Sequence, residues 1–337
     1  MPVNPPEPGR VLLVRLSHLG DVVHALPVFH ALRRRWPAAK LAWICQKEFA
    51  PLLTGLPGLD ESLLFDRRAG LRGVWRARRA MAAFGPDLTV DAQGNMKSAL
   101  LSRLSAAPRR LALAPVHWQE PVGARFMTEF APPAEGPHAI HKAASLIDAI
   151  GDRSPLSFDL GLSTAELEEG AKGLAKRFSA GSGQCWVLHL GREGDPRTWP
   201  SKRFASLALE LARRGDRALV LSGPAEAGTG QRLAHELQDE ERVSHWIGQG
   251  DLRQLAGFLT AAAAEGVGFV ACDSGPSHLA AACGLHVRLL SGPQDPLLTG
   301  PWPLEGAADS GNRIIRANPG GLGPMLGLEV ESVLALL

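Results

Sequence analysis

The sequence predicts an α/β protein made of two doubly wound units. Short apolar runs of strand length alternate with helical runs along both halves of the chain, which is typical of parallel sheets covered by helices. With 337 residues, 45% of them hydrophobic, the chain is too long for one core. Residues 151–163 are polar and contain Gly and Pro, which suits a connection between domains. We therefore expect one domain over residues 1–160 and a second over 161–337.

The first half is expected to alternate five strands with four helices. The strands are expected at 11–16, 40–45, 62–65, 87–91 and 109–113. The helices are expected at 21–35, 70–84, 95–105 and 138–150. Pro27 lies too deep for a first turn, so it is expected to kink or restart the first of these helices.

The second half repeats the alternation with six strands and four helices. The strands are expected at 186–190, 218–222, 243–246, 269–272, 287–290 and 313–316. The helices are expected at 201–214, 226–238, 251–262 and 277–283. Ligands of open parallel sheets collect outside the carboxyl ends of the strands, so two such units facing each other would form a cleft lined by the loops that follow the strands.

Residues 269–283, FVACDSGPSHLAAAC, are the most informative of these loops. An apolar strand runs directly into Asp273, Ser274 and Gly275 and then into a helix that carries His278. Unpaired N–H groups and the helix dipole make such a helix start an anion site, and the glycine permits the sharp turn. A phosphorylated ligand is expected there, although Asp273 or Ser274 could instead serve only as a helix cap.

The loop after the first strand, LSHLGDVVHALP, presents Asp21 at the start of a helix. Gly20 allows the turn, and the apolar residues that follow have helical spacing. Asp21 is either an ordinary N-cap or a functional carboxylate. As a functional group beside the helix dipole, it would stay ionised and could accept a proton from a substrate hydroxyl.

The segment 91–104, DAQGNMKSALLSRL, also places polar side chains between a strand and a helix. Gln93 and Lys97 are among them, and such a loop suits sugar hydroxyls or could be an ordinary turn. In the segment 189–204, HLGREGDPRTWPSKRF, basic side chains lie close to a helix start, as a diphosphate site requires. These basic residues are Arg192, Arg197, Lys202 and Arg203.

Glu226 follows the next strand of the second half. A carboxylate there could accept hydrogen bonds from ribose hydroxyls, as acidic residues do in dinucleotide folds. It could equally do no more than favour the helix dipole.

Positive charge gathers in the first half of the chain. Residues 1–160 hold 20 Lys and Arg against 14 Asp and Glu, whereas residues 161–337 hold 16 against 20. An anionic partner for the first half is plausible, and ordinary solvated helix faces are the alternative. Nucleic acid is disfavoured because no recognised nucleic-acid module is present. The arginine clusters are Arg33 to Arg35, Arg67 and Arg68, Arg72 to Arg79, and Arg109 and Arg110.

Several classes of site and of location are disfavoured. The sequence has no DxD, HExxH or CxxC, so no metal site is expected, and its four cysteines are expected to be buried and reduced. Without a Walker A motif or an intact GxGxxG, P-loop NTPases and ordinary dehydrogenases are disfavoured. The Pro-rich start does not resemble a signal peptide, and no apolar stretch of about 18 residues is present. The cytosol is the expected compartment.

Taken together, the motifs resemble the ADP-heptose:lipopolysaccharide heptosyltransferases, glycosyltransferase family nine. Four segments in the family's order carry the resemblance, which covers nearly the whole chain. They are VLLVRLSHLGDVVHALP, VDAQGNMKSAL, RTWPSKRF, and FVACDSGPSHLAAA followed by LLSGPQDPLLTGPW.

The resemblance implies a GT-B fold, with the acceptor on the first domain and the nucleotide-sugar donor on the second. It implies inverting, metal-independent transfer of a heptose from ADP-heptose to a lipopolysaccharide core acceptor, at the cytoplasmic face of the inner membrane. By match of motif, Asp21 corresponds to the general base. The residues expected to bind the donor are Arg197, Lys202, Glu226, Asp273, Ser274, Gly275 and His278. Those expected to bind acidic or hydroxyl groups of the acceptor are Arg67, Arg68, Gln93 and Lys97.

One departure from the family leaves other functions open. The loop 191–198 is rich in Gly and Arg and lacks the adjacent hydroxyl residues often found there in the family, so a different nucleotide sugar is an alternative donor. A nucleotide-sugar epimerase, or a nucleotide-sugar-binding protein without turnover, are the other two functions that we consider.

Overall fold

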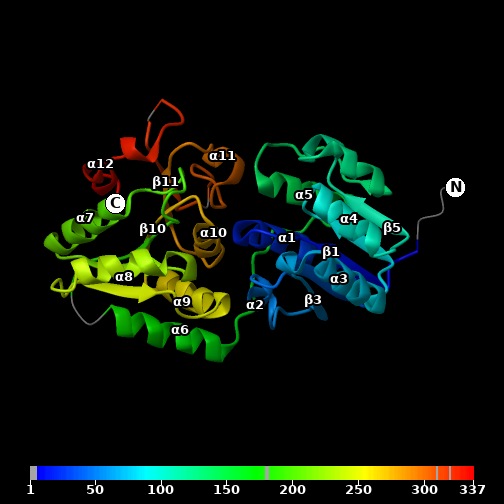
Figure 1. The fold of residues 1–337 in the computed structure, drawn as a ribbon, viewed down its shortest axis with the longest axis horizontal. Coiled ribbons are helices and arrows are strands. Elements are labelled where there is room, and N and C mark those ends of the chain that lie inside the picture. Colours follow the sequence, from blue (N-terminus) through cyan, green and yellow to red (C-terminus); the bar gives the residue numbers. More distant parts are fainter. Residues whose placement is uncertain (1–5, 179–181, 309, 319) are drawn as a thin grey trace. The chain divides into compact units, whose positions relative to one another are not determined.

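The computed structural model of the chain divides into two compact units, residues 1–161 and 162–337. It describes residues 6–178, 182–308, 310–318 and 320–337. Figure 1 shows the first unit in blue to green and the second in green to red. Each unit is a parallel sheet with helices packed against it.

The sheet of the first unit has the order β3-β2-β1-β4-β5-β6, and every paired strand is parallel to its neighbour. Its strands are β1 Arg10–Val14, β2 Lys40–Gln46, β3 Glu61–Phe65, β4 Leu88–Asp91, β5 Arg109–Ala112 and β6 Glu129–Phe130. Its helices are α1 Leu19–Arg35, α2 Ala50–Leu53, α3 Gly70–Phe84, α4 Met96–Leu104 and α5 Ala139–Ala149. Short 3₁₀ turns are η1 Arg67–Ala69, η2 Pro115–His117 and η3 Pro121–Phe126.

The second unit repeats this arrangement with the order β12-β11-β10-β7-β8-β9, again parallel throughout. Its strands are β7 Cys185–His189, β8 Arg217–Ser222, β9 Val243–Ile247, β10 Gly268–Cys272, β11 Val287–Ser291 and β12 Arg313–Arg316. Its helices are α6 Thr164–Arg177, α7 Ser201–Arg213, α8 Ala227–Glu236, α9 Leu252–Ala264, α10 Gly275–Ala282, α11 Pro296–Thr299 and α12 Val330–Leu334. The 3₁₀ turns are η4 Pro224–Glu226 and η5 Met325–Gly327.

The chain also contains elements that the sequence analysis did not predict, and helix α6 is the longest of them. A capping box formed by Ser163 and Glu166 starts it, and the Glu166 carboxylate accepts a 2.8 Å hydrogen bond from the buried Arg253 side chain of α9. The backbones of α6 and α9 approach each other closely at two glycines. A Cβ atom on Gly170 would lie 2.2 Å from the Gly257 carbonyl oxygen. Leu174 is the one large apolar side chain that α6 buries, so the sequence shows little of the apolar spacing that reveals a helix. The remaining additions are α2, α11, α12 and the two-residue edge strand β6.

Two expectations about local structure were wrong, and a third was right in at most one of its alternatives. Pro27 was expected to kink or restart helix α1, and the helix runs through Pro27 in one span, so it does not restart. Asp21 does not open that helix, because His18 is the N-cap and Asp21 is the third helical residue. Of the four cysteines, all of which are free thiols, only Cys45 and Cys272 are buried, while the other two are partly exposed.

Each unit buries its own core. In the first, Leu12, Val14 and Ile44 of the sheet pack with Met81 and Phe84 of α3. In the second, sheet residues pack with the fully buried Trp199 and Phe204 at the start of α7. No helix in the described part of the chain is long and apolar enough to cross a membrane.

Candidate active site

Both sheets reverse their strand order at an equivalent place, and the candidate residues lie there. In the first unit the reversal falls between β1 and β4, and in the second between β7 and β10. The loops that follow these two strands diverge to opposite faces of the sheet and leave a crevice, which is where ligands bind in open α/β sheets. Each reversal is described below within its own unit.

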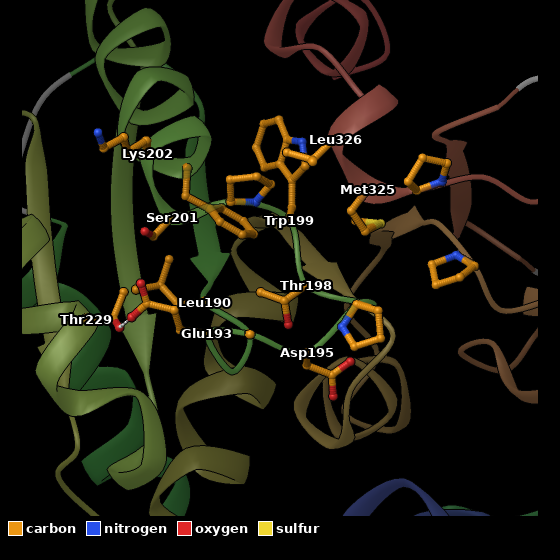
Figure 2. Close-up of a pocket in the computed structure, with 17 residues that line it drawn as sticks. Leu190, Glu193, Asp195, Thr198, Trp199, Ser201, Lys202, Thr229, Met325 and Leu326 are labelled. Atoms are coloured by element: carbon orange, nitrogen blue, oxygen red, sulfur yellow. Dashed lines mark hydrogen bonds between the residues drawn. The ribbon is translucent and has the colours of Figure 1, made fainter.

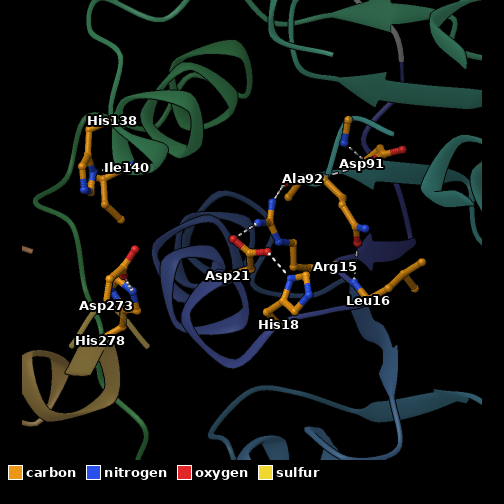
Figure 3. Close-up of polar contacts among 12 residues, drawn as sticks. Arg15, Leu16, His18, Asp21, Asp91, Ala92, His138, Ile140, Asp273 and His278 are labelled. Atoms are coloured by element: carbon orange, nitrogen blue, oxygen red, sulfur yellow. Dashed lines mark hydrogen bonds and ion pairs between the residues drawn. The ribbon is translucent and has the colours of Figure 1, made fainter. Parts of the chain in front are cut away.

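Asp21 is the central group of the first unit's reversal. One of its carboxylate oxygens lies 2.5 Å from the Arg15 guanidinium and the other 3.4 Å from His18 Nδ1 (Figure 3). Its side chain is 35% exposed, so it remains open to solvent. Burial by itself would raise the pKa of Asp21, but the charge of Arg15, together with His18 and His24, outweighs burial and lowers the pKa to about 2. The carboxylate is therefore ionised at neutral pH.

Arg15 also joins the two loops of this reversal. Its guanidinium donates to the carbonyl oxygen of Ala92, directly after β4, and the neighbouring Leu16 N–H donates to Gln93 Oε1 over 2.8 Å. The Asp91 carboxylate stabilises the loop after β4, because it accepts hydrogen bonds of 2.8 Å and 3.1 Å from the N–H groups of Gln93 and Gly94. Burial raises the pKa of this fully buried carboxyl.

The sequence analysis did not single out Arg15, although its position was informative. It is the first residue after an apolar strand and lies six residues before Asp21. Asp21 and the predicted Gln93 come together through it.

The other predicted acceptor residues are exposed and form no hydrogen bond or ion pair with Arg15 or Asp21 among the described residues. Lys97 is on the first turn of α4. Arg67 and Arg68 form the 3₁₀ turn after β3, at the outer edge of the sheet. Since parallel strands end at the same edge, all of these residues follow carboxyl ends of the sheet, but no contact joins Lys97, Arg67 or Arg68 to Asp21.

In the second unit, the loop after β10 forms a helix start with an unused hydroxyl. Ser274 is the N-cap of α10, and the helix begins at Gly275. The Ser277 hydroxyl lies 3.3 Å from the Ser274 N–H and donates to the Ser274 carbonyl oxygen over 2.6 Å. The Ser274 Oγ is buried and faces the Ser277 N–H in a capping-box arrangement, but it makes no hydrogen bond there or with any other described residue. No acidic residue lies in the first turn, so the positive end of the helix dipole is not neutralised from within the helix.

Asp273 is held beside this helix start. Its two carboxylate oxygens lie 3.2 Å from His278 Nε2 and 3.2 Å from the Thr299 hydroxyl (Figure 3). His278 is 7% exposed and lies on the first turns of α10. The predicted residues Asp273, Ser274, Gly275 and His278 thus form one continuous site.

The basic loop after β7 lies against this helix start. The Trp199 N–H donates to the Cys272 sulfur over 3.2 Å, which fixes the loop to the end of β10. Arg197 forms a two-point ion pair with Asp195, at 2.9 and 2.6 Å. This hydrogen bonding raises the pKa of Arg197, against burial, with further contributions from the charges of Asp195 and Asp273. The guanidinium is thus close to the α10 start but is neutralised by a neighbour.

Lys202 lines a cavity of about 690 Å³ between the 190–204 segment and η5 (Figure 2). Glu193 also lines it and accepts a 2.9 Å hydrogen bond from Thr229. The other predicted donor residues do not line this cavity. Glu226 lies in η4, on the loop after β8 and partly exposed, as a ribose-binding carboxylate would need to be.

His189 is a buried group that the sequence analysis did not single out. It is the last residue of β7 and stacks on Phe269 with ring centroids 6.4 Å apart. Burial lowers its pKa to about 4, so the ring is neutral at pH 7. Its position directly before the basic loop was the signal available in the sequence.

The comparisons with known proteins agree with one another. Residues 74–309 match glycosyltransferase family 9 (heptosyltransferase). The chain belongs to this family. Lipopolysaccharide heptosyltransferase 1 of Pseudomonas aeruginosa is 30% identical over 87% of this chain and 81% of its own length. The family-9 chain is accordingly a glycosyltransferase, as predicted.

Solved structures show the same fold. The Escherichia coli heptosyltransferase WaaC with ADP has a TM-score of 0.74 and 23% identity, covering 97% of this chain and 98% of that one. The same enzyme with ADP-2-deoxy-2-fluoro heptose has a TM-score of 0.74 and 22% identity over the same shares. The predicted GT-B fold with two Rossmann-like units is confirmed. Within the described residues, no group of three or more His, Cys, Asp or Glu is arranged to hold a metal ion.

Proposed function

We propose that this family-9 glycosyltransferase transfers a heptose from ADP-heptose to a lipopolysaccharide core acceptor, with inversion at the anomeric carbon. The observation that carries the proposal is the presence of two different sites at equivalent sheet reversals of one family-9 chain. One reversal holds an ionised carboxylate, and the other holds a helix start with a free hydroxyl. The names of the relative and of the structures with ADP and an ADP-heptose analogue support this choice of substrates.

The first unit is proposed to bind the acceptor, with Asp21 as the general base. A carboxylate whose pKa is about 2 is a weak base towards a free hydroxyl. It can still take the proton late in the reaction, because a hydroxyl oxygen that has begun to bond to the anomeric carbon becomes strongly acidic. Arg15 keeps Asp21 ionised and holds it in place for this step. Gln93, Lys97, Arg67 and Arg68 are proposed acceptor contacts.

The second unit is proposed to bind the donor and to stabilise the departing ADP. The Gly275 N–H, the Ser274 hydroxyl and the positive end of the helix dipole are suited to the diphosphate, while Pro276 has no N–H and the Ser277 N–H donates to the Ser274 carbonyl oxygen. Arg197 and Lys202 would add positive charge, His278 would contact the phosphates or the sugar, and Glu226 would accept from the ribose hydroxyls. Donors arranged in advance around the leaving group lower the barrier because the charge develops where they already point. The proposed place of action is the cytoplasmic face of the inner membrane.

The test is a turnover assay with purified protein, ADP-heptose and a deacylated core acceptor. Release of ADP that requires the acceptor, and a product whose anomeric configuration is opposite to the donor's, are the expected results. Parallel reactions with UDP- and GDP-sugars identify a different donor. An epimerised sugar nucleotide formed without acceptor would replace the proposal with an epimerase, and ADP binding without any turnover would replace it with a binding protein.

A further inference from the structure

Helix α3 and the preceding turn η1 carry a dense set of exposed arginines. The segment 67–84 contains six arginines and no acidic residue, and all six are exposed. We call this the α3 surface. It consists of Arg67, Arg68, Leu71, Arg72, Trp75, Arg76, Arg78 and Arg79.

These arginines differ from the other arginine cluster of the same unit. At the end of α1, Arg33, Arg34 and Arg35 each pair with a carboxylate, at 2.7, 2.7 and 3.1 Å. None of the six guanidiniums of the α3 surface forms an ion pair with any residue that the structure describes. The positive charge of the α3 surface is therefore not neutralised by carboxylates in the described part of the folded chain. The charge of the α1 cluster is neutralised by such ion pairs.

Two large apolar side chains are exposed next to these arginines. Leu71 is 87% exposed and Trp75 is 57% exposed. They are four residues apart, so they share one line along the helix. The opposite face, with Ala77, Met81 and Phe84, is buried against the sheet. Leu71 and Trp75 thus point to solvent although the helix already has a complete apolar face for the core.

The arginines flank this apolar line on both sides. At 100° per residue, Arg78 falls on one side of Leu71 and Trp75, while Arg72, Arg76 and Arg79 fall on the other. The Arg79 guanidinium lies 5.8 Å from the centre of the Trp75 ring. An aromatic and an aliphatic side chain framed by cations are typical of helices that lie in the interface of an anionic membrane.

We infer that the α3 surface docks this protein on an anionic phospholipid bilayer. Leu71 and Trp75 insert at the boundary between headgroups and acyl chains, where indole rings are favoured. Arg72, Arg76, Arg78 and Arg79 contact lipid phosphates, whereas Arg67 and Arg68 remain the proposed acceptor contacts. Each basic residue near such a surface strengthens binding about fivefold. The inference goes beyond the proposed transfer reaction and does not depend on it, because lipid binding is measured without donor or acceptor.

The experiment is co-sedimentation of the full-length protein with phosphatidylcholine vesicles that contain or lack phosphatidylglycerol. We expect binding only to the anionic vesicles, and weaker binding as salt is raised. The triple variant R72Q/R76Q/R79Q should lose about 100-fold in affinity, and L71S/W75S about 10-fold. None of these positions is a proposed substrate contact.

A matched control separates this surface from net charge. The variant K172Q/K176Q/R213Q removes the same three positive charges from exposed positions of α6 and α7 and should bind vesicles like the unmodified protein. Equal losses in both triple variants, or no binding of the unmodified protein to anionic vesicles, would overturn the inference. Concentration-dependent self-association that L71S/W75S abolishes, without vesicle binding, would show instead that a second copy covers the surface.

Discussion

The two sheet reversals have the same topology but opposite chemistry. In the first unit a loop of four residues joins β1 to α1, and Asp21 stands in the first turn of that helix. In the second unit the first turn of α10 carries no acidic residue and leaves the Ser274 Oγ without a partner. A carboxylate at a helix start fills the position that an anion would otherwise take. The two helix starts follow different strands of the reversal, because β1 corresponds to β7 and β10 to β4. They also differ in charge: Asp21 lies within the first turn of α1, whereas the Asp273 carboxylate beside α10 is held by His278 and Thr299.

The largest expected effect comes from removing the carboxylate of the first reversal. Asp21→Asn should lower turnover about 10³-fold, since general-base catalysis is typically worth 10²- to 10⁴-fold, while ADP affinity stays unchanged. Steady-state kinetics and calorimetric titration with ADP measure the two quantities. Asp152→Asn is the control, because it removes another ion-paired carboxylate of the same unit. Full turnover by Asp21→Asn would end its assignment as the base.

Acid should destabilise the protein through the buried His189. Its pKa in the folded protein is about 4, below the ordinary value of about 6.5. The unfolded chain therefore binds a proton at a higher pH than the folded one, and stability falls as pH drops from 6.5 to 4 by up to about 3 kcal/mol. Urea unfolding at pH 7, 5 and 4 should show this loss in the unmodified protein.

A variant at this position identifies the group responsible. His189→Phe removes the titrating ring, so the part of the pH dependence that belongs to His189 should disappear. The part due to His30, His117 and His245 remains, because burial lowers the pKa of each of these rings too. An identical pH dependence in the variant would mean that His189 is not the group that titrates. Asp21 behaves differently, because its contribution is complete above about pH 4 and is lost only between about 4 and 2.

The free hydroxyl of the second reversal gives a smaller effect. Ser274→Ala should weaken ADP binding about 10-fold, as expected for one hydrogen bond to a charged group. Thermal stability should change little, because the Ser274 Oγ has no partner within the described chain. Calorimetry with ADP and thermal unfolding test the two halves of this statement. A large loss of stability with unchanged ADP affinity would make Ser274 an ordinary helix cap.

The smallest expected effect is that of metal removal. The charge on the departing ADP is proposed to be met by the α10 start and by basic side chains, so turnover after EDTA treatment should stay within about twofold of the untreated rate. A loss that Mg²⁺ restores would show that the second reversal needs a cation that these groups do not replace.

Much of the architecture was accessible from the sequence because its signals are local. The alternation of apolar strands and helices predicted every strand of both sheets except β6, whose two residues are too few to show a period. Helix α6 was missed because it buries only one large apolar side chain, Leu174, and approaches α9 through Gly170 and Gly257. The positions of Asp21 and of the 273–278 turn followed from the rule that ligands gather at the carboxyl ends of strands.

By itself, the sequence determined the fold class, the family and the segments that hold the candidate site, since periodicity and ordered motifs are properties of neighbouring residues. Only the tertiary structure decided how those residues are charged and partnered. It brought Arg15 to Ala92, 77 residues away, as well as to Asp21, and left the arginines of the α3 surface without carboxylates. These outcomes depend on which side chains meet after the strands pair, and electrostatic interactions act over a few ångströms in space whatever the separation along the chain.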